Sequence, residues 1–92
     1  MNTSVEIAKL NEYLVEVLKI DGVANAFVWE PTAYDQADMP GVRPQLMVEA
    51  YRSARGGNPH NVQADISTAW LEQVSEGTGD YGPCWVWSVK RS

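Results

Sequence analysis

His60 and Cys84 are the residues best suited to covalent chemistry, because each is the only member of its type in the chain. A thiolate beside an imidazole base forms a common nucleophilic pair. Nothing in the sequence places these two residues in contact, and a lone cysteine within an apolar segment is typical of a buried side chain. The sequence therefore predicts no catalytic dyad, and we expect a protein that is not an enzyme.

The segment from Gly77 to Gly82 matches the dinucleotide-binding pattern G-x-G-x-x-G. That chemistry requires the glycines to follow a strand and to begin a helix whose N-terminus meets the pyrophosphate. Here a helix is expected before the segment, Asp80 occupies it, and Pro83 and a strand follow. We interpret it as a glycine-rich turn.

Arg52, Arg55, Gly56, Gly57 and His60 form a second candidate site, in a turn just before a predicted helix. Helix N-termini attract anions, and arginine side chains would add positive charge. The turn lacks the lysine and the Ser/Thr of a phosphate-binding loop. A small anion-binding or ligand-binding domain, or an enzyme that uses this turn, stays open as an alternative.

Carboxylates form two further groups. Asp35 and Asp38 are a sparse pair without nearby His, Cys or Glu ligands, so the sequence predicts no metal site and no cofactor. Asp65, Glu72 and Glu76 would form a strip along one edge of the predicted second helix, about 10 and 6 Å apart along its axis. No lysine lies within four residues of this strip, which would allow it to oppose a basic groove.

Periodicity and turn signals define the elements that would position these residues. A Thr3–Glu6 capping box and apolar residues at helical spacing predict a helix over residues 4–20, which Gly22 ends. Val62, Ile66 and Trp70 indicate a second helix. The expected order is a helix over 4–20, strands over 23–30 and 45–52, a helix over 59–75 and a strand over 84–89, with a long connection over 31–44.

These elements predict one compact α+β domain over residues 1–92. We expect a three-stranded, mainly antiparallel sheet in the order helix-strand-strand-helix-strand, with both helices on one face. The residues expected to face the helices are Phe27, Trp29, Leu46, Val48, Ala50, Trp85, Trp87 and Val89. The opposite register would instead expose the tryptophans as an aromatic platform for a dimer or a partner.

The net charge of −5 has an uneven distribution, since no Lys or Arg occurs from Ile20 to Val42 or from Gly56 to Val89. This distribution opposes direct binding of nucleic acid and favours a protein partner with a basic surface. No apolar run is long enough to cross a membrane. A single cysteine and the absence of a signal sequence predict a cytoplasmic protein.

In size, acidity and absence of motifs, the chain resembles the small inhibitors that bacteriophages use against host defences, among them the anti-CRISPR proteins. From the charge and the lack of catalytic motifs we expect a monomeric or homodimeric inhibitor that occupies a basic or nucleic-acid-binding surface of a larger complex, and the resemblance supports this expectation without assigning a site. A structural subunit of a virus-type assembly is a further alternative. The predicted partner-binding residues are Asp65, Glu72, Glu76, Glu30, Asp35, Asp38 and Tyr34.

Overall fold

The computed structural model describes residues 3–91, and the outermost residues of the predicted domain, Met1, Asn2 and Ser92, lie outside the described residues. The elements in chain order are α1 (Thr3–Val17), β1 (Val23–Trp29), α2 (Ala33–Asp38), β2 (Gln45–Ala50), α3 (Ala54–Gly57), α4 (His60–Ala64), β3 (Leu71–Thr78) and β4 (Pro83–Val89).

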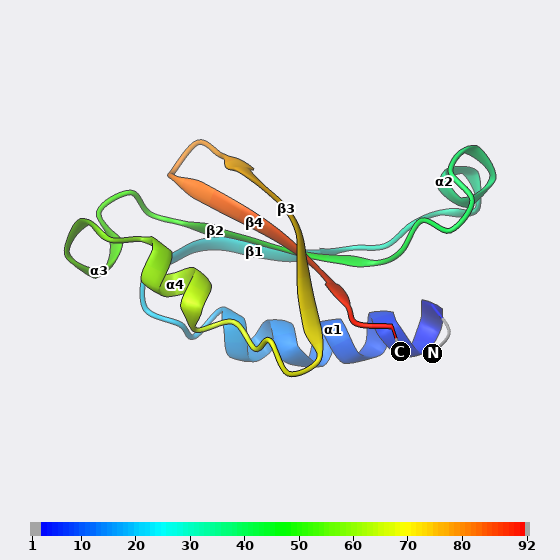
Figure 1. The fold of residues 1–92 in the computed structure, drawn as a ribbon, viewed down its shortest axis with the longest axis horizontal. Coiled ribbons are helices and arrows are strands. Elements are labelled where there is room, and N and C mark those ends of the chain that lie inside the picture. The colour runs from blue at the N-terminus through cyan, green and yellow to red at the C-terminus, as the bar shows by residue number, and fades with distance from the viewer. Residues whose placement is uncertain (1–2, 92) are drawn as a thin grey trace.

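The strands form one sheet in the order β1-β2-β4-β3, and every neighbouring pair is antiparallel. Figure 1 shows α1 lying along one side of this twisted sheet, with α4 on the same side and α2 at the far end of the long axis. The predicted α+β class is confirmed. The predicted count of three strands is wrong, because β3 comes from a segment that we expected to be helical.

The second predicted helix ends at Ala64 rather than near residue 75. Val62 and Ile66 are buried as predicted, but Ser67 turns the chain, and its hydroxyl accepts a hydrogen bond from the Ala69 amide at 3.3 Å. Such local side-chain bonds compete with the helical hydrogen bonds. Beyond this turn the chain pairs with β4 as a strand, so the periodicity at 59–75 gave a wrong prediction for its second half.

The core lies between the sheet and the helices, and β4 crosses its centre. Trp85 and Trp87 are 1% and 3% exposed and, with Val89, face the helices as predicted. The prediction for Phe27 and Trp29 is wrong. In the observed register they lie opposite Met47 and Gln45, whereas the smaller Ala26 and Val28 lie opposite the core residues of β2. Phe27 is therefore 44% exposed on the face that lacks helices.

Tyr13 ties the connection before β3 to helix α1. Its hydroxyl accepts a hydrogen bond from the Ser67 amide at 2.9 Å. Its ring packs edge-on against Trp70 with 5.2 Å between ring centroids, and the Lys9 ammonium lies 4.8 Å from the Trp70 ring centroid. Trp70 is thus a half-buried clamp at the side of α1, while the interior tryptophans are those of β4.

Glu6 does not form the predicted capping box. Its side chain is fully buried, and neither carboxylate oxygen has a hydrogen-bond partner in the described structure. Instead, one oxygen lies 3.9 Å from Arg43 Nε and the other 3.8 Å from Arg91 Nε. The Arg43 guanidinium also pairs with Glu72 at 3.3 Å. This ionic chain links α1, the segment just before β2, the start of β3 and the C-terminal segment.

Candidate functional site

Residues 30–39 form a protrusion, here called the acidic tip, between β1 and β2. Figure 1 shows it at the end of the long axis, where the β1 and β2 segments extend past the sheet and end at α2. The molecule measures 42 Å along this axis and 24 Å and 20 Å across it. Helix α2 contains no buried residue. Helix α2 therefore adds no side chain to the core.

A capping box holds the acidic tip in shape. The Thr32 hydroxyl accepts from the Asp35 amide at 3.2 Å, and Asp35 Oδ2 accepts from the Thr32 amide at 2.8 Å and from the Thr32 hydroxyl at 2.9 Å. Reciprocal bonds of this kind satisfy amides at a helix start that lack partners within the helix. They fix α2, which is too short to be stable by itself.

Two apolar side chains project from the tip. Tyr34 is 80% exposed, the highest value among the large exposed hydrophobic residues of the described chain, and Met39 is 53% exposed. Pro31, at the base of the tip, is buried. An exposed aromatic ring on a fixed backbone is the type of residue that anchors protein interfaces, since it contributes a large contact area at little entropic cost.

The charges around Tyr34 are all negative. Glu30 and Asp38 are exposed, and their carboxylates form no hydrogen bond and no ion pair within residues 3–91. Asp35, by contrast, is half-buried and its carboxylate is occupied by the cap. Since no Lys or Arg occurs from Ile20 to Val42, the tip presents uncompensated negative charge.

The structure separates the residues predicted to bind a partner into different regions. Glu30, Tyr34, Asp35 and Asp38 come together on the acidic tip. The strip formed by the other three does not exist as predicted, because the helix that would have aligned them ends at Ala64. Those three residues are Asp65, which lies just after α4, and Glu72 and Glu76, which lie on β3.

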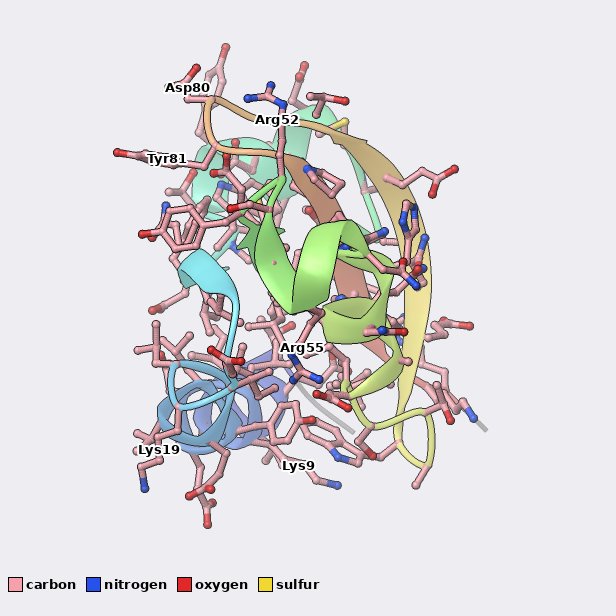
Figure 2. The ribbon with its side chains drawn as sticks, turned by 90° about the vertical axis from the view of Figure 1, so that its left-hand side faces the viewer. Lys9, Lys19, Arg52, Arg55, Asp80 and Tyr81 are labelled. Atoms are coloured by element: carbon pink, nitrogen blue, oxygen red, sulfur yellow. The ribbon has the colours of Figure 1, made fainter. Side chains whose placement is uncertain are left out.

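The predicted anion-binding turn is occupied by the protein's own groups. Arg55 donates from Nε to the Asp21 carbonyl at 3.0 Å and from Nη2 to Asp65 Oδ2 at 2.5 Å. Arg52 Nη1 donates to the Asp80 carbonyl at 3.3 Å. Figure 2 shows Arg52 beside Asp80 at the top of the view and Arg55 well below it, toward α1. The two guanidinium groups therefore do not converge on a common site.

The glycines of this turn have a conformational role. Gly56 and Gly57 have φ values of 70° and 92°, and Arg55 itself has a φ of 54°. The left-handed conformation favours glycine. Arg55 adopts it although it is not a glycine, and its contacts with Asp21 and Asp65 hold it there. Arg55, Gly56 and Gly57 all lie within α3, which contains four residues, and α4, which follows, contains five. Both helices are too short to provide a substantial dipole.

His60 and Cys84 lie on opposite faces of the sheet. The His60 ring packs against Trp85 on the helix-covered side, with 5.8 Å between ring centroids. Cys84 precedes Trp85 on the same strand, so its side chain points to the other face. A hollow of about 380 Å³ adjoins His60, but neither Arg52 nor Arg55 lines it. The geometry therefore keeps the Cys84 thiol and the His60 imidazole apart.

Residues 77–82 form the turn predicted from their glycines. Gly77 and Thr78 end β3, and the Gly79 amide donates to the Gly82 carbonyl at 2.8 Å to close a β-hairpin into β4. Glu49 fixes this turn, because its Oε2 accepts from the Tyr81 amide at 2.7 Å. The strand β4, rather than a helix, follows the glycines, so the segment lacks the geometry of a dinucleotide site.

The described part of the chain contains neither a cluster of metal ligands nor a membrane-spanning helix. Over residues 3–91, no three His, Cys, Asp or Glu side chains are grouped as a metal ion would require. In the same part of the chain, none of the helices has the length and apolar character needed to cross a bilayer.

The sequence prediction missed the ionic chain of Glu6, Arg43, Glu72 and Arg91. A signal for it was present, because Glu6 precedes Leu10 by four residues and Val17 by a further seven, which places it on the apolar arc of α1. The comparisons with known proteins add no assignment: no family model, curated protein or solved structure matches the chain. The fold and site therefore define only a small acidic α+β protein with a projecting, negatively charged tip.

Proposed function

We propose that this protein is a non-enzymatic binding module that inserts its acidic tip into a basic surface of a larger protein. The observation that supports the proposal most directly is Tyr34, which is 80% exposed on a capped helix that buries nothing. Holding a large apolar ring in water has no benefit for the fold. It has a clear benefit for a partner that can bury the ring.

The charge of the acidic tip indicates a partner with a basic surface. Glu30 and Asp38 flank Tyr34 without basic neighbours, so a surface rich in Lys or Arg would be attracted to the tip and oriented by it. Surfaces of this type are typical of proteins that bind nucleic acid, since they neutralise phosphates with Lys and Arg. In the sharper form of the proposal, the tip occupies such a surface and inhibits nucleic-acid binding, as in phage inhibitors of the anti-CRISPR type.

Site-specific crosslinking tests the proposal. A photoreactive phenylalanine analogue replaces Tyr34 in one variant and Tyr81 in a control. Tyr81 is 56% exposed and lies on the β3–β4 turn, away from α2. In the cells that make the protein, we expect the Tyr34 variant to crosslink to one defined protein and the Tyr81 variant to fail. Equal crosslinking from both positions would contradict a tip-centred interface.

The captured partner then allows quantitative tests. Tyr34→Ala is expected to weaken binding by about 30-fold or more, the loss typical of a central aromatic anchor. Asp38→Lys should slow association and reduce its salt dependence. Asp80→Lys, at the opposite end of the molecule, is the matched control and should leave both unchanged. If Asp80→Lys weakened binding as much as Asp38→Lys, net charge rather than the tip would explain the affinity.

A further inference from the structure

β3 forms an open edge of the sheet. It is the last strand in the order β1-β2-β4-β3, and its only strand partner is β4. Each residue from Glu72 to Thr78 is exposed, and only Leu71 is buried. Its neighbour β4 is buried from Trp85 to Val89. The edge therefore lies at the surface along almost the whole strand.

The backbone of this edge has hydrogen-bonding capacity left over. In an antiparallel pair, alternate residues direct their N–H and C=O groups away from the partner strand. Among the described residues, no backbone or side-chain group outside β4 bonds to the backbone of residues 72–78. Such an edge is a template on which another extended chain can pair.

The side chains of the edge select for charge. Glu72 and Glu76 point to opposite faces of the sheet. They lie across from Ser88 and Trp85, whose side chains are on opposite faces of β4. Glu76 has no ion-pair partner in the described chain, and Glu72 is 48% exposed beside Arg43. Because no Lys or Arg occurs from Gly56 to Val89, β3 itself carries no positive charge, and a basic strand meets the Arg43 guanidinium at Glu72 but an unpaired carboxylate at Glu76.

A second copy of the chain is a poor occupant. Two β3 strands side by side would bring Glu72 and Glu76 of both copies to one edge, with no Lys or Arg on either strand to offset the negative charge. Val74 also interrupts the ladder, because the register with β4 shifts between Gln73 and Ser75. Bulges and charges of this kind protect an edge against self-association.

We infer that β3 accepts an extended, basic peptide segment of a partner protein as a fifth strand of the sheet. Main-chain hydrogen bonds along residues 72–78 supply the affinity, and lysine or arginine side chains opposite Glu72 and Glu76 supply the selectivity. Val74, 48% exposed at the bulge, offers an apolar contact between them. This site is separate from the acidic tip and does not depend on it.

Selection from a display library of random ten-residue peptides against the whole protein tests the inference. We expect the enriched peptides to contain at least two Lys or Arg among β-forming residues. Bound to the ¹⁵N-labelled protein, they should shift the amide resonances of residues 72–78. Glu76→Lys should weaken binding at least tenfold and Glu76→Gln about threefold. Glu12→Lys, an exposed change on α1, should stay within twofold.

The remaining variants separate this site from the tip. Tyr34→Ala should leave peptide binding unchanged, so the tip proposal and the edge inference can fail independently. The inference is overturned if no peptide is enriched, if the enriched peptides lack basic residues, or if the shifts fall on the tip or the uncovered sheet face. It is also overturned if Glu76→Lys, shown to be folded by circular dichroism, binds the peptides as the native protein does.

Discussion

Glu6→Gln is the most informative single change in this fold. The Glu6 carboxylate is fully buried, and its two oxygens lie 3.9 Å from Arg43 Nε and 3.8 Å from Arg91 Nε. At such separations each pair contributes roughly 4 kcal/mol of attraction at an effective dielectric constant near 20. Part of this attraction offsets the several kcal/mol that burial of the carboxylate costs.

Removing one partner of a buried pair typically costs about 3–5 kcal/mol, since the other charge stays buried without compensation. Arg43 retains Glu72 at 3.3 Å, and Arg91 is half-exposed and can rehydrate. We therefore expect the lower end, a loss of about 3 kcal/mol in the free energy of unfolding. For a domain of this size that loss corresponds to a fall in Tm of roughly 12–24 °C.

Urea unfolding followed by tryptophan fluorescence measures this loss. The matched control is Glu12→Gln on the same helix, where the carboxylate is exposed and no ion pair is present, and its effect should stay within about 0.5 kcal/mol. The double variant Glu6→Met with Arg43→Met should recover most of the stability, because paired apolar replacement removes both burial costs. A loss below about 1 kcal/mol for Glu6→Gln, or a double variant that loses the sum of its single changes, would refute the reasoning.

Two other changes test the packing of turns and the cap of the tip. Gly22→Ala should destabilise the fold by about 2–3 kcal/mol, because φ is 96° and the new Cβ would lie 2.7 Å from Ala54 Cβ. Gly41→Ala is the control, since Gly41 has a φ of 88° but open space around it. It should cost only about 1 kcal/mol in the same urea assay. Thr32→Val should remove the hydroxyl that accepts from the Asp35 amide and cost α2 about 1 kcal/mol. Faster hydrogen exchange in residues 33–38 with an unchanged Tm would confirm it, and an unchanged exchange rate would contradict it.

The first half of the chain was predictable because its local signals agree with its tertiary contacts. The apolar arc of α1, the left-handed Gly22 and the β-rich segment after it all indicate the elements that the structure contains. The boundaries of α1, β1 and β2 differ from the prediction by a few residues, but the expected connection over 31–44 is wrong in part, because it contains helix α2 (Ala33–Asp38). The burial of Glu6 was missed because a glutamate three residues after Thr3 fits a capping box as well as it fits a buried ion pair. Only the positions of Arg43 and Arg91 in the fold decide between the two.

The second half was less predictable, because a long-range interaction determines it. Leu71 to Thr78 contains a mixture of residues that a helix tolerates, and its strand state depends on pairing with β4 across the Gly79–Gly82 turn. The stronger signal was the turn itself, since a glycine-rich turn between two extended segments is typical of a β-hairpin. The helical spacing of Ile66, Trp70 and Val74 instead predicted a helix through this segment.

The acidic tip illustrates why residue types alone do not define a site. In the sequence Asp35 and Asp38 are equivalent, three residues apart in a proline-bounded connection. In the structure the Asp35 carboxylate accepts two hydrogen bonds from Thr32 and caps α2, whereas the Asp38 carboxylate has no partner within residues 3–91. One carboxylate therefore has a structural role and the other is free to meet a cation. For this reason a charge change at Asp38 tests binding, while a change at Asp35 would mix binding with the loss of the helix that positions Tyr34.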